Sequence, residues 1–267
     1  MRIACLVWLI AGCGFTSQEG PVDPADDDGA GGAPGGGSGG SGTTASQCDV
    51  TDASLRLCLT FDTPTVQDLL EPPHALADNT GIQILRILAN ATAKLDGRSH
   101  IRFMPSGDFD APELTLDLLI DPGKLMKDQN SATLIDHDQH YFAAYQDDGH
   151  IQCGIGDKEV TSEATVSGGW HHIACRYEAA RHELRVYVDG SVSGCTDVSG
   201  GIPAGGPGEL AIGASYNAST YQNSYVGSLD SMHVYGRALS DAELCSAAQK
   251  TSCNTRCPDQ GGPRGPQ

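Results

Sequence analysis

Basic side chains are scarce in this sequence of 267 residues, which has 16 Lys and Arg against 34 Asp and Glu and a formal net charge of -18. Because phosphate groups bind to basic surfaces, this balance argues against a nucleic-acid ligand. It argues equally against electrostatic docking on anionic lipid. Long apolar stretches are also missing, and none reaches the roughly 18–20 residues that a helix needs to cross a bilayer. The sequence therefore predicts no membrane-spanning helix.

The first residues have the layout of a secretory signal peptide, with Arg2 as the basic residue and residues 3–11 as a short apolar segment. Its end, Ile-Ala-Gly-Cys at 10–13, resembles the lipobox of bacterial lipoproteins, in which the cysteine receives the lipid and becomes the new N-terminus. The resemblance implies removal of residues 1–12 and a lipid on Cys13. The alternative is an ordinary signal peptide with an incidental cysteine. Gly14 is not the aspartate that favours inner-membrane retention, so we expect an exported protein anchored at the outer membrane or cell surface.

Two segments of biased composition flank a single predicted domain. Residues 13–47 are rich in Gly, Ser and Asp, contain no Lys or Arg and have almost nothing to bury, which predicts a disordered tether. The three aspartates at 26–28 are interpreted as solvated charge rather than as a metal site. Residues 258–267 predict a disordered tail. One folded domain, residues 48–257, remains between them.

Alternating apolar and polar residues, the mark of half-buried strands, recur through this domain. In Leu-Thr-Leu-Asp-Leu-Leu-Ile at 114–120, Leu114, Leu116, Leu118 and Ile120 share one face. Asp189-Gly190 is a strong hairpin turn signal. Helix signals are confined to a capping-box spacing at Ser240, which predicts a short helix to about residue 250. The other predicted strands are residues 56–61, 82–93, 184–188, 210–212 and 232–234. Many short strands with frequent turns predict an all-β sandwich or barrel.

A resemblance to the laminin-G-like, concanavalin A-like jelly rolls narrows this choice. Trp-His-His-Ile-Ala-Cys-Arg-Tyr at 170–177 and Leu-Arg-Val-Tyr-Val-Asp-Gly at 184–190 look like the signature hairpin of that family. Residues 57–62, 95–120 and 225–244 resemble its opening strand, its central module and its last strand with the short helix. The resemblance implies an antiparallel two-sheet β-sandwich with one concave sheet and one short C-terminal helix. It implies less about function, because this fold hosts lectins, hydrolases, lyases and structural domains.

Catalytic motifs are missing. Glucanases of this fold carry Glu-x-Asp-x-x-Glu on one strand, and no glutamate here has an aspartate two residues later, so we expect no enzyme of that type. Asp-His-Asp-Gln-His at 136–140 could ligate a metal or act as an acid and base, but it is interpreted as a solvated loop. His171 and His172 belong to the fold signature, which indicates structural hydrogen bonds.

Calcium is the expected ion, because several relatives bind it through oxygen ligands near the opening and closing strands. The matching positions are Asp62 and Asp230, with Asp96 a weaker match; Asp230 could instead form a turn or an ion pair.

The cysteines of the domain number eight, and an even count in an exported domain implies up to four disulfides. The family fold implies a Cys153–Cys175 bond between neighbouring strands and a Cys58–Cys245 bond between the chain ends. Cys48 is predicted to pair with Cys253 or Cys257, and the sequence assigns no partner to Cys195. No Cys-x-x-Cys is present, so zinc binding by these cysteines is disfavoured.

Together these features predict a non-catalytic, lipid-anchored binding module that recognises a glycan or a surface protein. Aromatic side chains suit either ligand, and the candidates are Tyr141, Tyr145, Tyr216, Tyr221 and Tyr225. Two alternatives remain open. One is a carbohydrate-active enzyme, a hydrolase or lyase, with an unrecognised carboxylate arrangement; the other is a structural envelope protein without a small ligand.

Overall fold

The computed structural model describes residues 48–87, 90–138, 140–203, 208–217 and 219–258. The predicted signal peptide, the lipidation at Cys13, the tether of residues 13–47 and residues 259–267 of the predicted tail therefore lie outside the described residues. Within the described part, no helix combines the length and the apolar character needed to cross a membrane.

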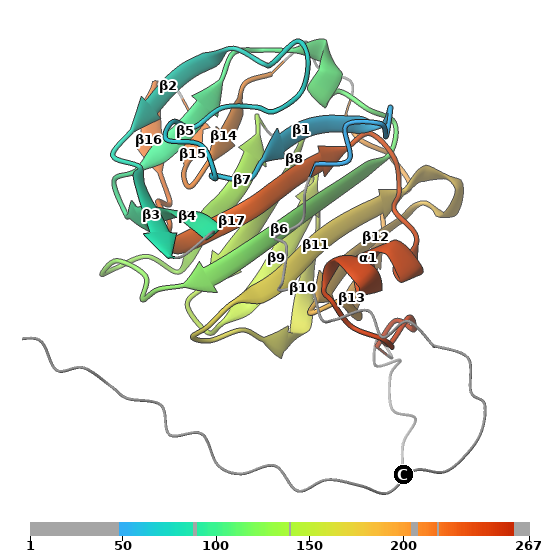
Figure 1. Ribbon diagram of the computed structural model, residues 1–267. Helices are drawn as coiled ribbons and strands as arrows, with labels where there is room; N and C mark the ends of the chain where they lie inside the picture. Colours follow the sequence, from blue (N-terminus) through green and yellow to red (C-terminus); the bar gives the residue numbers. More distant parts are fainter. Residues whose placement is uncertain (1–47, 88–89, 139, 204–207, 218, 259–267) are drawn as a thin grey trace, which may run out of the picture. The chain divides into compact units, whose positions relative to one another are not determined.

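Two large antiparallel sheets form a sandwich, as predicted (Figure 1). The first sheet has the order β13-β12-β11-β6-β17-β4-β3, and β1 also pairs with β17. Its strands are β13 (Ser191–Asp197), β12 (Glu183–Val188), β11 (His171–Glu178), β6 (Leu114–Pro122), β17 (Val226–Tyr235), β4 (Asn90–Asp96), β3 (Gln83–Ile87) and β1 (Leu55–Leu59).

The second sheet has the order β10-β9-β8-β7-β14-β5-β2, and a separate two-stranded hairpin, β15-β16, follows β14 along the chain. The strands are β10 (Lys158–Thr165), β9 (His150–Ile155), β8 (Tyr141–Gln146), β7 (Ser131–His137), β14 (Leu210–Ile212), β5 (His100–Phe103), β2 (Leu76–Thr80), β15 (Ser215–Asn217) and β16 (Thr220–Gln222). Two short 3-10 turns, η1 (Gly107–Phe109) and η2 (Ala179–Arg181), and the helix α1 (Asp241–Ala247) complete the described elements.

The core lies between the two sheets, and β6 shows how the sequence places its residues. Leu114, Leu116, Leu118 and Ile120 are all buried in the shared core cluster, which confirms the predicted alternation. Asp117 lies on the opposite face and is nevertheless 5% exposed. The outer face of this sheet is therefore covered as well, which alternation alone does not reveal.

A bulge in β17 alters the simple alternation of that strand. Leu229, Met232 and Val234 all enter the core, although two residues rather than one lie between Leu229 and Met232. The pairing with β6 shifts between Asp230 and Met232, and Ser231 has a φ of 38°. An extra residue at a bulge reverses the facing of the residues that follow, so the strand keeps apolar residues inward on both sides of it.

Two expected elements differ in the structure. The single strand predicted for residues 82–93 is wrong: β3 and β4 form an antiparallel pair there, with Ile87 opposite Asn90. The predicted helix ends at Ala247 rather than near residue 250. The turn signal at Asp189-Gly190 is confirmed, because both residues have positive φ, 49° and 78°, as a tight hairpin between β12 and β13 requires.

Helix α1 packs on the outer face of the first sheet. Leu239 and Leu244 join Ala174, Tyr187 and Val192 in a second apolar cluster. At the start of the helix, Asp241 accepts hydrogen bonds from Arg176 at 2.8 Å and from the Tyr187 hydroxyl at 2.7 Å. The helix is thus held by apolar packing and by a charged pair that is largely shielded from solvent.

The capping box predicted at Ser240 is present and supports a stability prediction. Ser240 Oγ accepts the Glu243 backbone N–H, and the Glu243 carboxylate accepts the Ser240 backbone N–H. Ser240→Ala is expected to lower the free energy of unfolding by about 1 kcal/mol, because one N–H at the helix start loses its partner. Urea denaturation would measure it. Ser246→Ala, an exposed serine of the same helix, is the control, and an equal loss in both variants would contradict the role of the cap.

Four disulfides use all eight cysteines of the domain. The structure pairs Cys48–Cys58, Cys153–Cys175, Cys195–Cys257 and Cys245–Cys253. The prediction for Cys153 and Cys175 is confirmed, although β9 and β11 face each other across the sandwich rather than lying side by side in one sheet. The predicted Cys58–Cys245 bond is wrong, as are the partners predicted for Cys48, because each of these cysteines pairs with a residue close to it in sequence.

Candidate functional site

The β15-β16 hairpin presents two of the predicted tyrosines as a cross-strand pair. Tyr216 and Tyr221 lie opposite each other in its register, and their ring centroids are 4.9 Å apart. Both side chains are partly exposed. The hairpin therefore offers aromatic surface outside the core.

Arg102, an outward residue of β5, fixes this pair. Its guanidinium lies 4.2 Å from the centre of the Tyr216 ring, and its Nε donates to the Tyr221 hydroxyl at 3.1 Å. One terminal nitrogen donates to Glu209 at 2.6 Å. A cation held against an aromatic face stabilises the ring position. Tyr216 is thus oriented before any ligand arrives.

Tyr221 is held from its other side by two residues of the neighbouring strands. Its hydroxyl donates to Asp78 of β2 at 3.0 Å, and the ring of His100 of β5 stacks on it at 3.4 Å. His100 also lies 3.0 Å from the same Asp78 oxygen, and this hydrogen bond is the largest cause that lowers the pKa of Asp78 to about 2. Tyr221 therefore serves mainly to hold the hairpin, and Tyr216 is the ring that remains available.

A hollow of about 290 Å³ lies beside Tyr216. We call it the hairpin pocket; its lining includes Pro105, Asp136, Asp138, Glu209, Tyr216 and Asn217. Its volume is near the lower end of the roughly 300–1,000 Å³ typical of small-molecule sites. Burial, and then the nearby charge of Asp138, raise the pKa of Asp136 to about 6. The pocket thus combines one aromatic face with several hydrogen-bond acceptors.

The other three predicted tyrosines belong to the core, so the prediction that they contact a ligand is wrong. Tyr225 is 0% exposed and Tyr141 is 1% exposed, so neither ring can stack on a ligand. Tyr145 is buried in the same core cluster, and its hydroxyl lies 3.4 Å from the Val166 carbonyl. In β8 the residues at 141, 143 and 145 all point inward, which is the alternation that a strand imposes.

The residues that hold the pocket were missed from the sequence. His-Ile-Arg-Phe at 100–103 alternates polar and apolar residues, which is a signal that His100 and Arg102 face outward. No local pattern connects them with Tyr221 or with Glu209, which lie more than 100 positions away. Their role follows from the strand order, in which β5 lies next to β14.

The cluster at residues 136–140 is not the solvated loop that was predicted. Asp136 and His137 close β7, and His137 is 0% exposed. His140 is 8% exposed, and its Nδ1 lies 3.2 Å from Asp110 Oδ1. Burial, and then the charge of His140, lower the pKa of His137 to about 4. The two imidazoles and the Asp110 carboxylate thus form one compact group at the end of β7.

The predicted structural role of His171 and His172 is confirmed. His171 Nδ1 lies 3.1 Å from Asp189 in the adjacent turn. His172 Nε2 lies 2.6 Å from Asp117, whose other carboxylate oxygen is 3.2 Å from His233 Nδ1. Burial by itself would raise the pKa of Asp117, but the two imidazoles hold it well below its ordinary value of 3.8. This buried group ties β6, β11 and β17 together.

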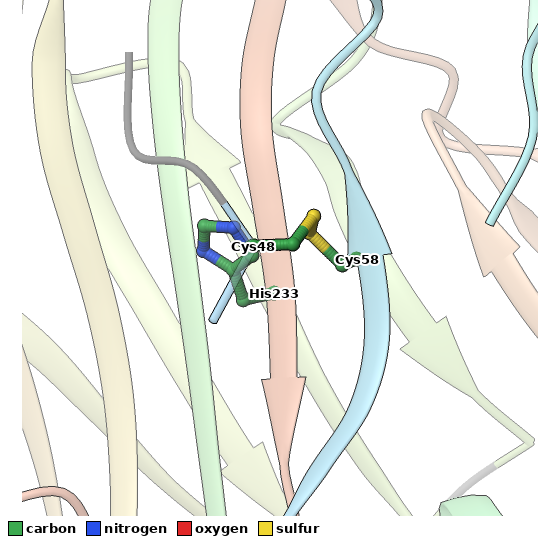
Figure 2. A group of neighbouring side chains, drawn as sticks. All are labelled: Cys48, Cys58 and His233. Atoms are coloured by element: carbon green, nitrogen blue, oxygen red, sulfur yellow. A yellow bond between two sulfur atoms is a disulfide. The ribbon is translucent and has the colours of Figure 1, made fainter. Parts of the chain in front are cut away.

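The Cys48–Cys58 disulfide lies beside the ring of His233 (Figure 2). The two sulfur atoms and a ring nitrogen lie within 4.8 Å of one another, as metal ligands can. Both cysteines are oxidised, however, and a metal needs the thiolate. The disulfide instead covers the buried His233 side chain on the outer face of the first sheet.

The two predicted calcium ligands have backbone partners in the structure. Asp62 accepts a hydrogen bond from the Ala91 N–H at 3.2 Å, and Asp230 accepts one from the Ser231 N–H at 2.8 Å. In the described part of the chain, neither belongs to a cluster of three or more side chains spaced as metal ligands. Calcium binding at Asp62 and Asp230 stays a prediction.

The two antiparallel sheets pack face to face as in a jelly roll, a fold that hosts many unrelated functions. The chain belongs to the concanavalin A-like lectin/glucanase superfamily, whose family model matches residues 95–245. The resemblance inferred from the signature hairpin and the closing strand is thus confirmed.

Solved structures share this fold at low identity. The binding domain of Paraclostridial Mosquitocidal Protein 1 has a TM-score of 0.60 and 18% identity over 75% of this chain and 52% of its own. Domain 4 of AbnA, a GH43 extracellular arabinanase from Geobacillus stearothermophilus solved in complex with arabinotriose, has a TM-score of 0.59 and 18% identity. That match covers 73% of this chain and 98% of the arabinanase domain. Both likenesses show the fold.

A curated rat protein (Rattus norvegicus) also matches: the sushi, von Willebrand factor type A, EGF and pentraxin domain-containing protein 1 is 29% identical over 111 residues. The match covers 39% of this chain and 3% of that protein, so the chain spans a small part of this relative. The four disulfides indicate an extracellular or surface protein, because disulfides persist in oxidising compartments.

Proposed function

We propose that this chain is a non-catalytic binding module, exported and held at the outer membrane or cell surface by a lipid on Cys13, that recognises a neutral glycan. The observation that carries the proposal is the hairpin pocket, in which Arg102 and the hairpin hold Tyr216 beside a row of hydrogen-bond acceptors. The jelly-roll fold supports it, since the arabinanase domain of the same fold was solved with arabinotriose.

The chemistry of the pocket suits a sugar ring. One face of a sugar carries C–H groups that pack on an aromatic ring, and its edge carries hydroxyls that donate hydrogen bonds. Tyr216 supplies the ring, and Asp136, Asp138 and Glu209 supply acceptors. Because Tyr216 is already oriented, binding costs little side-chain ordering.

The charge of the pocket selects among glycans. Three carboxylates line it, and the whole chain has a net charge of -18. A sialylated or uronic-acid glycan would meet like charges at close range, which disfavours binding. A neutral oligosaccharide has no such penalty.

Tyr216→Ala is expected to weaken glycan binding at least about 10-fold, which corresponds to about 1.4 kcal/mol. A neutral-glycan array, with arabinotriose as the first probe, would identify a ligand, and isothermal titration calorimetry would measure the affinities. Tyr216→Phe should bind as the parent does, because the proposal uses the ring and not the hydroxyl. Trp170→Ala is the matched control, since Trp170 is another exposed aromatic residue, 43% exposed, outside the pocket.

Loss of binding in Trp170→Ala with full binding in Tyr216→Ala would place the site elsewhere and overturn the assignment of the pocket. If the array is blank and crosslinking in cells captures a protein at the same face, the ligand is a surface protein rather than a glycan. A blank array with no captured partner favours a structural envelope protein.

A carbohydrate-active enzyme of the same fold is the second candidate, because glycosidases act through a pair of carboxyl groups and this pocket has three. In the structure Glu209 is engaged by Arg102. Release of reducing ends from a bound glycan, lost in Glu209→Gln, would establish an enzyme. A bound glycan of unchanged chain length after prolonged incubation supports the binding module.

A further inference from the structure

Asp110, His137 and His140 come together from two separate segments. His137 is the last residue of β7 and His140 precedes β8; the His140 backbone N–H donates to the His137 carbonyl at 2.7 Å, which closes the turn between them. Asp110 follows η1 and approaches from some 30 positions earlier in the chain. We call these three residues the His–His–Asp cluster.

We propose that the His–His–Asp cluster binds a divalent transition-metal ion of the zinc class. One ligand atom from each side chain lies within 4.8 Å of the other two. Asp110 Oδ1 is 3.2 Å from His140 Nδ1 and 4.0 Å from His137 Nε2. Ligand atoms around a tetrahedral zinc ion, each about 2.0–2.1 Å from the metal, are roughly 3.3 Å apart. The distance from Asp110 to His140 lies close to that value and the distance to His137 is longer, so side-chain movements that bring His137 nearer to Asp110 would complete the geometry.

The buried ring nitrogens provide a second, independent observation. His137 is 0% exposed, and neither of its ring nitrogens has a partner in full hydrogen-bond geometry within the described residues, although the Gly208 backbone lies near enough to interact with the ring. His140 Nδ1 is also buried without a partner in hydrogen-bond geometry there, although the Asp110 carboxylate is 3.2 Å away. Buried polar atoms in folded proteins nearly always have partners. A metal ion between His137 Nε2, His140 Nδ1 and Asp110 would partner one buried nitrogen of each imidazole.

The surroundings orient the rings and leave a route for the ion. The His137 ring stacks on Tyr141 with centroids 4.8 Å apart and meets Phe109 edge-on at 5.9 Å. Apolar walls of this kind restrict how far a ligand can turn. Asp110 is exposed, so the ion can enter from the solvent side. Three protein ligands leave a fourth position for water on a zinc-class ion.

The ligand types decide the class of metal. Two imidazole nitrogens and one carboxylate suit zinc and the neighbouring first-row ions. Calcium binds six to eight oxygen atoms and disfavours a site with two nitrogens. The cluster is therefore distinct from the calcium site predicted at Asp62 and Asp230.

The test is metal binding to the purified, metal-stripped protein, with Zn²⁺ in titration calorimetry and Co²⁺ as a spectroscopic probe. We expect one ion per chain, with the intense visible absorption of four-coordinate Co²⁺. His140→Asn and Asp110→Asn should each weaken Zn²⁺ binding at least 10-fold. His182→Asn is the matched control: it removes an exposed histidine from a left-handed position that Asn also accepts.

A second readout protects the test from misfolded variants. Saturating Zn²⁺ should raise the Tm of the parent protein and of His182→Asn, because the folded state alone holds the assembled cluster. The shift should vanish in Asp110→Asn, whose exposed side chain can be changed without disturbing the core. Absence of saturable Zn²⁺ binding, or equal binding and equal Tm shifts in Asp110→Asn and the parent, would overturn the proposal. Tyr216→Ala should bind Zn²⁺ as the parent does, which separates this site from the glycan site.

Discussion

Asp117→Asn is expected to lower the free energy of unfolding by about 3 kcal/mol at pH 7, and the Tm by roughly 6–12 °C. Asp117 is buried, and its two oxygens face His172 and His233 at 2.6 and 3.2 Å. The amide of Asn presents an N–H group to one of these imidazoles and carries no charge. Both ring nitrogens then lose a charged acceptor, and one of them faces an N–H group instead of an oxygen. The contact among β6, β11 and β17 is weakened.

The pH dependence of this effect follows from the lowered pKa of Asp117. Burial opposes ionisation, but the two imidazoles hold the folded-state pKa well below the ordinary value of 3.8. A lowered pKa contributes stability that is complete above about pH 4 and is lost as the pH falls toward the folded-state value. Ionisation of Asp117 should therefore leave the stability difference between the parent and Asp117→Asn constant near neutral pH. Below about pH 4 the difference should shrink.

Urea denaturation at pH 7, 5, 4 and 3 would measure this difference. Asp157→Asn is the matched control, because the Asp157 side chain is 89% exposed and its ion-pair partner among the described residues is Lys158, at 3.6 Å. A control variant that loses as much stability as Asp117→Asn, or a difference that grows as the pH falls below 4, would contradict the assignment of Asp117.

Removal of the Cys153–Cys175 bond by the double change to Ala is expected to cost about 3–4 kcal/mol. The 22-residue separation gives about 3 kcal/mol from the restricted unfolded chain. Both cysteines are buried between the sheets, 0% and 2% exposed, so the lost sulfur atoms also leave space in the core. This bond is the covalent link between β9 and β11, one strand of each large sheet.

Thermal unfolding would show a Tm lower by roughly 6–16 °C. The corresponding double change at Cys245 and Cys253 is the control, because it also removes one disulfide but over a separation of 8 residues. Closing that shorter loop contributes about 2.5 kcal/mol to the free energy of unfolding. Both of its cysteines are only half-buried, so their removal costs little core packing. A larger loss from the control pair would show that the link between the sheets is not the main covalent stabiliser.

Strand identity and facing could be predicted where alternation is local. In β6 each leucine predicted to face inward is in the core. The same rule applied to Tyr141 and Tyr145, which flank Ala143 with the same parity, indicates that they face inward together. Their aromatic character alone made these two tyrosines ligand candidates, and the strand geometry rules them out.

The disulfide pattern shows where prediction from sequence ends. Eight cysteines allow 105 pairings, and the fold analogy favoured a bond between the chain ends. The residues before β1 instead bring Cys48 to Cys58, and the segment after α1 returns Cys253 to Cys245. These segments are irregular, so their paths depend on the tertiary contacts that they make. No periodic sequence pattern predicts those contacts.

The sequence by itself determined the β-sandwich class, the family and the capping box, because each is recorded in strand alternation or in motifs of residues close together in the chain. Only the tertiary structure decided that Arg102 and Glu209 hold Tyr216, and that Asp110 meets His137 and His140. These groups join strands and loops up to about a hundred positions apart. Their contacts depend on strand order and on register, in which a shift of one residue turns every side chain to the other face.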